Sequence, residues 1–276
     1  MELRECALDY LGLSNPEIKV EAVSQLQADF LKGAIDLDVS RSLIPQAQIP
    51  GLPEKPDLVS PKYVKRRAMN TQEGRAAMIH ALAHIEFNAI NLALDAVWRF
   101  PNMPQQYYGD WLRVAAEEAY HFSLLNQHLE KLGYGYGDFN AHASLWEMAE
   151  KTTDDVLARM ALVPRTMEAR GLDASPSLRS KLAQVGDAEA AAILDIILRD
   201  EIGHVAIGNH WFNYLCNLRQ AEPISTYAAL ATKYEAPVPR KPFNHTARLA
   251  AIRTHLDRLE GLGMVGTLFG GNGFNR

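Results

Sequence analysis

The stretch RVAAEEAYHFSLL, residues 113–125, indicates both how this chain folds and where its chemistry lies. It is largely apolar but holds an acid pair and a histidine, with Glu118 and His121 three residues apart. Residues at that spacing lie on one face of an α-helix, so both side chains can point at the same metal ion. The stretch LRDEIGHVAI, residues 198–207, repeats the arrangement with Glu201 and His204. One such pair is common by chance on a helix surface, but two pairs among apolar neighbours predict buried carboxylates that need a cation.

Two further glutamates complete a ligand pattern for two metal ions. In helical bundles of this kind, two helices each provide one Glu and two others each provide a Glu-x-x-His pair. Glu86 precedes Glu118 by 32 residues, and Glu168 precedes Glu201 by 33. Each interval suits a helical hairpin, because two arms of about 13 residues, roughly 20 Å each, return the carboxylates to one level. The sequence therefore predicts a two-metal site made by Glu86, Glu118, His121, Glu168, Glu201 and His204.

The second hairpin is less regular than the first. Gly171 and Pro176 follow Glu168 closely, and Pro164, one turn before it, should bend the helix. Either the helix continues past a kink through residues 172–185, or the ligand lies elsewhere, with Glu147 and Glu150 as the alternatives.

Acids and histidines near these pairs have two readings each. A metal-bound histidine usually donates its second N–H to a carboxylate, a role that Glu117 and Asp200 can fill. Alternatively both acids are exposed and solubilising, with Arg199 as a surface partner of Asp200. The other histidines receive structural interpretations: His80 and His84 facing away from the cluster, and His128 in the core or in a hydrogen-bond network.

The helical period extends through most of the chain and predicts an all-α fold, a ferritin-like four-helix bundle with additional N-terminal and C-terminal helices. We expect one compact domain of three regions: N-terminal helices and a Pro-rich strap (1–70), the bundle (71–220) and a C-terminal helical extension (221–276). The expected helices cover two short segments within 1–35, then about 72–99, 104–132, 143–170, 188–219, 224–234 and 245–261. Residues 44–63 contain five prolines and predict an extended strap.

Composition narrows the class of protein. The start of the chain, residues 1–20, carries charges where a secretory signal needs an apolar run, and no segment offers about 18 uncharged apolar residues. Two cysteines without a CxxC pattern suit a reducing compartment, so we expect a cytoplasmic protein without a membrane partner. A net charge of −5 disfavours a nucleic-acid-coating role. The one basic cluster, residues 61–67, favours a solvated helix approach over a phosphate-binding or RNA-binding patch.

The chain also resembles a known family. The segments that carry the likeness are HALAHIEFNAINLALDAVWRF (80–100), EEAYHFSLLNQHLEKLGYGYGDFNAH (117–142), LVPRTMEARGLD (162–173), ILRDEIGHVAIGNHWF (197–212) and VPRKPFNHTARLAA (238–251). They resemble an uncharacterised bacterial family with a ferritin-like fold, domain of unknown function 455, over nearly the whole chain. MEAR with DEIGH is also similar, locally, to the non-haem diiron enzyme that hydroxylates modified tRNA, so tRNA stays among the conceivable partners. The resemblance implies the same six metal ligands that the spacing predicts.

Carboxylates with two imidazoles suit iron most, and manganese or a mixed Mn/Fe pair also fits. The function favoured is O₂-dependent oxidation or hydroxylation of a small-molecule substrate, with an unidentified redox partner, in a monomer or dimer. The alternatives are an iron-handling, ferroxidase-like protein and a non-catalytic helical bundle.

Overall fold

The computed structural model describes the fold of residues 1–261 and the side chains of residues 1–254, and that part of the chain contains helices but no strand. This confirms the all-α fold class. The helices are α1 (Leu3–Leu11), α2 (Pro16–Leu31), the 3₁₀ turn η1 (Pro61–Tyr63), α3 (Gln72–Arg99), α4 (Gln105–Lys131), α5 (Ser144–Lys151), α6 (Val156–Leu162), the π-helical turn η2 (Val163–Glu168), α7 (Ala169–Gln184), α8 (Ala188–Leu218), α9 (Pro223–Lys233) and α10 (His245–Gly261).

The helices α3, α4 and α8 begin and end within one residue of the predicted ranges 72–99, 104–132 and 188–219. Thr71 precedes α3, and its side chain accepts a hydrogen bond from the Gly74 N–H at 3.0 Å. Asp187 precedes α8 and accepts one from the Ala190 N–H at 3.0 Å. Gly133 follows α4 with φ +80°, a conformation that glycine adopts readily and that ends the helix.

One predicted helix is wrong. The segment expected as a single helix over 143–170 is divided into α5, α6 and the π-helical turn η2, and the helical path then continues through α7 to Gln184. The break after α5 falls on a Thr-Thr-Asp-Asp run (152–155), residues whose side chains compete for backbone hydrogen bonds, as Thr152 Oγ1 does with the Met148 carbonyl at 2.9 Å. Pro176 lies inside α7 without ending it. Of the two alternatives for the region after Glu168, the continued helix is therefore the one observed.

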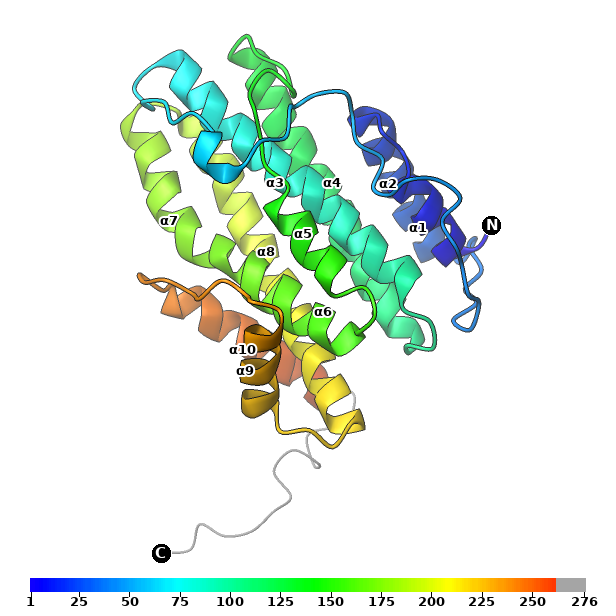
Figure 1. The fold of residues 1–276 in the computed structure, drawn as a ribbon. Coiled ribbons are helices and arrows are strands. Elements are labelled where there is room, and N and C mark those ends of the chain that lie inside the picture. The colour runs from blue at the N-terminus through cyan, green and yellow to red at the C-terminus, as the bar shows by residue number, and fades with distance from the viewer. Residues whose placement is uncertain (262–276) are drawn as a thin grey trace, which may run out of the picture. The chain divides into compact units, whose positions relative to one another are not determined.

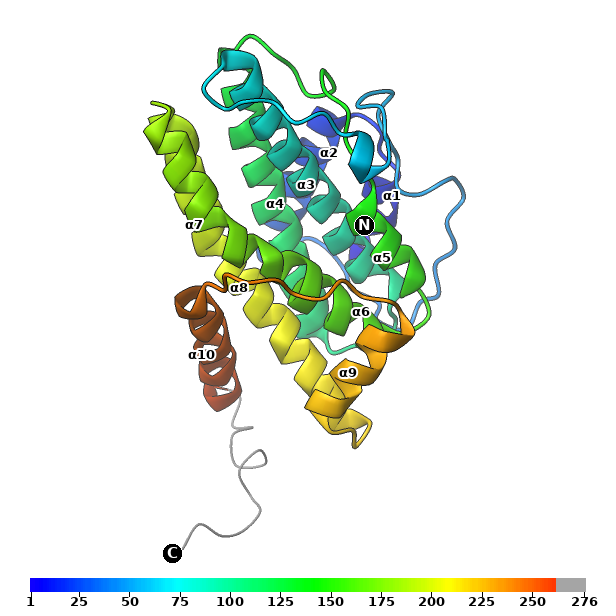
Figure 2. The same ribbon diagram turned by 60° about the vertical axis from the view of Figure 1, so that its left-hand side comes forward.

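The chain consists of two compact units, which are described separately here. Unit 1 comprises Met1–Val156 and Ser175–Ile197, and unit 2 comprises Leu157–Ala174 and the chain from Leu198 onward. In unit 1, α3 and α4 lie side by side along their lengths, with α1 packed on α3 and α2 on α4 (Figures 1 and 2). The predicted division into three regions of one domain stays a prediction.

The helices α1 and α2 are fastened to α3 by a buried cation. Lys19 of α2 is fully buried, and its Nζ donates to Asn91 Oδ1 of α3 at 2.5 Å and to the Leu11 carbonyl at 3.2 Å. Nζ also lies 4.9 Å from the centre of the Phe87 ring. Burial lowers the pKa of Lys19 to about 7. The N-terminal helices thus share a core with the α3–α4 hairpin.

Unit 2 has a core of small residues. Ala247 and Ala251 of α10 pack with Val205 and Ala206 of α8 and with Leu172 of α7. Small side chains allow the helix backbones to approach closely, and Gly208 of α8 is the extreme case: a Cβ there would lie 2.5 Å from Pro164 Cβ. The π-helical turn is therefore held tightly against α8.

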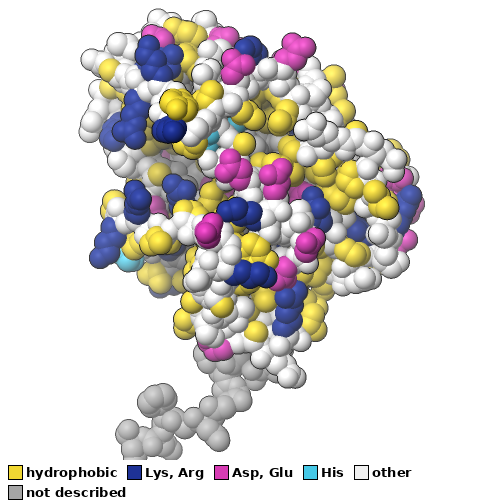
Figure 3. Space-filling model, viewed as in Figure 1, with side chains coloured by type: hydrophobic (Ala, Val, Ile, Leu, Met, Phe, Trp, Pro, Cys, Tyr) yellow, Lys and Arg dark blue, Asp and Glu magenta, His cyan; other side chains and the backbone are white. Residues whose placement is uncertain are grey.

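The surface carries charges of both signs, and the most apolar helix, α3, is mostly buried. Figure 3 shows one face of the molecule, on which Lys and Arg side chains are interspersed with Asp and Glu. Helix α3 is long and apolar enough to cross a membrane by length and composition, but 72% of its apolar window is buried inside the protein. That burial is typical of the core helix of a soluble protein. The predicted cytoplasmic location stays a prediction.

Candidate metal centre

Unit 1 brings three of the predicted ligands together, and we call them the first ligand group. Glu86 of α3 and Glu118 and His121 of α4 each offer a ligand atom, and these atoms lie within 4.8 Å of one another. His121 Nδ1 is 3.2 Å from Glu118 Oε2 and 3.4 Å from Glu86 Oε2. The hairpin argument explains the meeting, because equal arms on either side of the turn return Glu86 and Glu118 to one level. Such a buried cluster could hold a metal ion.

The first ligand group is shielded from water. Glu118 and His121 have no exposed surface, and Glu86 is 3% exposed. Burial, and then the neighbouring Glu118 carboxylate, raises the pKa of Glu86 well above its ordinary value, while His121 acts in the opposite direction. Among the described residues, no Lys or Arg forms an ion pair with Glu86. A divalent cation would remove this penalty and keep both carboxylates ionised.

The other three predicted ligands lie in unit 2, and we call them the second ligand group. Glu201 and His204 of α8 are buried, with 8% and 0% exposure, and His204 Nδ1 lies 3.8 Å from Glu201 Oε1. Glu168 is partly buried and is the last residue of the π-helical turn η2. The three-residue spacing thus places Glu and His on one helix face here as well.

The π-helical turn gives the second group an irregular support. Pro164 within it lacks the N–H that an α-helical bond needs, and Thr166 Oγ1 donates to the carbonyl of Ala161, five residues earlier, at 2.9 Å. Single π-turns inside helices occur often at functional sites, because the extra residue redirects the side chains that follow. The alternatives to Glu168 do not fit a buried centre, since Glu147 and Glu150 are exposed on α5.

The two acids expected beside the ligands differ in their surroundings. Glu117 of α4 is partly exposed and lies 3.9 Å from Arg113 Nε. Asp200 of α8 accepts hydrogen bonds from Arg199 at 2.8 and 2.9 Å, the surface partner that the sequence offers. Their role toward the ligand histidines stays a prediction.

Two histidines of α3 are engaged with the loop after α4. His84 Nδ1 lies 2.9 Å from the Tyr136 hydroxyl, and His80 Nε2 accepts a hydrogen bond from the Gly137 N–H at 3.0 Å. Both imidazoles are buried, and burial lowers the pKa of each to about 4. They are uncharged at neutral pH and anchor that loop to α3.

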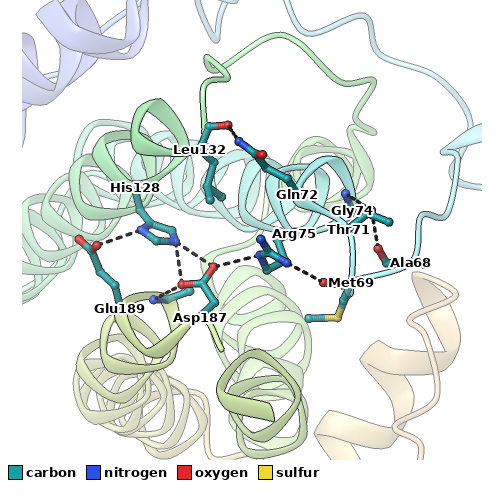
Figure 4. Close-up of polar contacts among 11 residues, drawn as sticks. Ala68, Met69, Thr71, Gln72, Gly74, Arg75, His128, Leu132, Asp187 and Glu189 are labelled. Atoms are coloured by element: carbon teal, nitrogen blue, oxygen red, sulfur yellow. Dashed lines mark hydrogen bonds and ion pairs between the residues drawn. The ribbon is translucent and has the colours of Figure 1, made fainter. Parts of the chain in front are cut away.

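A second group of a histidine and two acids occurs in unit 1, with His128 and Asp187 buried and Glu189 exposed, and we call it the cap network (Figure 4). His128 of α4 lies between two acids at the start of α8: its Nε2 is 3.0 Å from Asp187 Oδ1, and its Nδ1 is 3.5 Å from Glu189 Oε2. Two cations complete it, Arg75 at 3.9 Å from Asp187 Oδ2 and Lys131 at 2.5 Å from Glu189. The interpretation of His128 as a network residue is confirmed.

The sequence reasoning passed over Arg165, which lies three residues before Glu168 and lines a cavity of unit 2. A guanidinium within the apolar run ALVPRTM was the available signal.

Comparison with known proteins identifies relatives without a described activity. A family model described as protein of unknown function (DUF455) matches residues 12–255. An uncharacterized protein of Haemophilus influenzae is 51% identical over 250 residues, which cover 87% of this chain and 87% of that protein. No solved structure matches the chain.

Proposed function

The chain belongs to the DUF455 family, and we propose that it is a dimetal-carboxylate protein of the ferritin-like kind. The ligands we propose are Glu86, Glu118, His121, Glu168, Glu201 and His204. One observation carries the proposal: Glu86 is buried beside the Glu118 carboxylate, its pKa is raised, and the His121 imidazole lies 3.4 Å from it. Two such carboxylates are costly to bury unless a cation lies between them.

The donor atoms decide which metal is proposed. Carboxylate oxygens and imidazole nitrogens suit iron or manganese, whereas structural zinc sites favour four ligands with thiolates. Cys6 and Cys216, the two cysteines of the chain, are buried elsewhere and do not belong to either ligand group. We propose two iron ions, with manganese or a mixed Mn/Fe pair as chemically equivalent occupants of the same ligands.

A reduced pair of iron ions, when bound, supplies electrons to O₂, so the reaction class we propose is O₂-dependent oxidation or hydroxylation of a small molecule. The residues of the chain do the rest. His121 binds through a neutral ring nitrogen, and Glu86 and Glu118 supply negative charge. Phe87 and Phe122, which follow Glu86 and His121 in the chain, are buried with ring centres 5.7 Å apart. Glu117 and Asp200 are proposed to hydrogen-bond the ligand imidazoles and so fix their orientation.

Metal analysis tests the ligand set. Protein purified with ferrous or manganous salt should hold about two metal ions per chain, and Glu118→Ala combined with Glu201→Ala should lose them while the helices stay folded. Glu130→Ala, an exposed acid on the same helix α4, is the matched control and should retain the metal. A double variant that keeps its metal, or a wild-type protein that never binds any, would contradict the ligand assignment.

Oxygen uptake tests the reaction class separately. Protein loaded with Fe(II) under anaerobic conditions should consume O₂ when exposed to it, measured with an oxygen electrode. A metal-loaded protein that ignores O₂ would refute the oxidase proposal and leave the metal site standing. If the O₂-consuming protein elutes from size-exclusion chromatography as a large multi-subunit shell, the result would indicate iron handling instead of substrate oxidation.

A further inference from the structure

Unit 2 contains a cavity of about 270 Å³, and the charged residues that line it, among those the structure describes, are all positive. Arg165 and Arg248 are its charged residues, and the remainder of the described lining is apolar or uncharged: Ala169, Val205, Asn209, Tyr227, Pro239 and Ile252. Ligand cavities in proteins measure roughly 300–1,000 Å³, and this one, just below that range, has room for a small molecule of a few heavy atoms. The charge points to an anion.

Arg165 carries a positive charge that the described residues do not neutralise. Its Nε donates to Asn209 Oδ1 at 2.8 Å, whereas its Nη1 is buried and has no hydrogen-bond partner in the described part of the chain. The guanidinium lies 4.1 Å from the Phe212 ring centre and 5.4 Å from that of Tyr227. Burial lowers the pKa of Arg165, and no carboxylate is among the groups that act on it. The rings stabilise the cation partly, but they cannot accept its hydrogen bonds in the way an anion does.

The second arginine of the cavity, Arg248, differs from Arg165 because its guanidinium is paired with a carboxylate of the same unit. Arg248 donates to both carboxylate oxygens of Asp173, at 2.9 and 2.6 Å. Its charge is therefore compensated within the protein, and it needs no ligand. The Asn209 side-chain oxygen is used by Arg165, so its amide N–H groups are available as additional donors. The Arg165 guanidinium and the Asn209 amide can therefore both donate to an oxyanion.

We propose that this cavity binds a small organic anion, whose carboxylate or phosphate oxygens accept hydrogen bonds from the Arg165 guanidinium and the Asn209 amide. Arginine suits both groups because its planar fork matches two oxygens at once. Arg165 belongs to the same π-helical turn as Glu168, and Val205, which lines the cavity, follows His204. The role of this anion as the charged end of the substrate rests on the proposed function; the binding of the anion does not.

Thermal unfolding of the metal-free protein tests anion binding separately from the proposed metal-dependent function. The full chain, treated with a chelator, is heated at constant ionic strength with acetate, with inorganic phosphate, or with acetamide as the uncharged analogue of acetate. Acetate or phosphate should raise Tm in proportion to the logarithm of its concentration above Kd, and acetamide should not. The anion that stabilises more identifies the oxyanion class. An equal response to acetamide, or no response to either anion, overturns the inference whatever the metal content.

Variants locate the binding. Arg165→Gln should weaken the anion response by about tenfold or more, because a charge-assisted bond is removed. Arg253→Gln, which removes an exposed arginine of α10 outside the cavity lining, is the matched control and should respond like wild type. Asn209→Asp places a carboxylate against Arg165 and should abolish the response while the protein stays folded, so the inference remains testable if Arg165→Gln does not fold. An undiminished response in Arg165→Gln, or in Asn209→Asp, overturns it.

Discussion

The first ligand group and the cap network are built from the same residue types on the same helix, yet they differ in what neutralises their acids. His121 and His128 are both buried histidines of α4, seven residues apart, and each faces two acids. In the cap network, Arg75 and Lys131 lie beside the acids. In the first ligand group, Glu86 has an imidazole as its described ionic partner and a raised pKa.

The difference teaches how to separate a structural network from a metal centre. A buried acid that has a protein cation needs nothing more, and its removal costs stability. A buried acid whose neighbour is another acid is destabilising until a cation binds, so its removal should cost metal binding instead. The four predictions below test this distinction, from the largest expected effect to the smallest.

Asp187→Ala should destabilise the protein most, by about 3–5 kcal/mol, because it removes the buried carboxylate that contacts both His128 and Arg75. It also removes the hydrogen bond to the Ala190 N–H that begins α8. Urea denaturation of the variant, with and without chelator, should show the same loss in both conditions. A loss that appears only when metal is present would mean that the cap network is itself a metal site.

His80 extends the comparison to a buried imidazole that accepts a hydrogen bond from a backbone N–H and is not a proposed metal ligand. Its pKa is about 4 in the folded protein, because of burial first and His84 second, against 6.5 ordinarily. The unfolded chain therefore binds the proton more tightly, and stability falls as pH drops from 6.5 through 4, by at most about 3 kcal/mol from this residue.

In a pH series of urea denaturation, His80→Gln should unfold with a shallower loss of stability between pH 6.5 and 4 than wild type. The glutamine side-chain oxygen would accept the hydrogen bond that the Gly137 N–H donates to His80, and an amide does not titrate in this range. An unchanged slope would show that folding does not change the pKa of His80.

Glu86→Gln should have the opposite sign to Asp187→Ala in the metal-free protein. Because the folded pKa of Glu86 lies above 4.5, the folded state holds the proton more tightly, and stability declines as pH rises from 4.5 toward that raised pKa. The decline is at most about 1.4 kcal/mol per pH unit, and the variant should lack it and be more stable than wild type near pH 7.

The same variant should gain less stability than wild type from added Fe(II) or Mn(II), since it has lost a charged ligand. Denaturation of both proteins in chelator and in metal gives the four values needed. A Glu86→Gln protein that is less stable than wild type in chelator would place Glu86 with the structural acids.

Lys131→Gln should have the smallest effect, below about 0.5 kcal/mol, although it removes a cation from the cap network. Lys131 and Glu189 are exposed by 61% and 49%, so water and salt screen their attraction. The Tm of the variant should match wild type within about 1–2 °C. A larger loss would show that the charge of Lys131 acts on His128 inside the network.

The helices of unit 1 were predictable because their signals are local. Thr71 and Pro104 mark helix starts, Gly133 marks an end, and the apolar period between them continues without interruption. The meeting of Glu86 with Glu118 followed from counting residues along two straight arms. The path around Glu168 could not be predicted in this way, because Pro164, Gly171 and Pro176 each permit a break or a continuation. The close approach of Gly208 to Pro164 shows how tightly the observed path packs on α8.

The sequence by itself determined the all-α fold, most helix boundaries and the residue types of both ligand groups, since helical periodicity and i, i+3 spacing depend on neighbours along the chain. Only the tertiary structure decided which charges are compensated. In the sequence, Asp187 and Glu86 have no acid or cation beside them. Packing alone places Arg75 near Asp187 and the Glu118 carboxylate near Glu86. Likewise the sequence around Arg165 does not show that folding places its guanidinium beside two aromatic rings and a cavity. Burial sets the energy of a charge, and burial is a property of the folded chain.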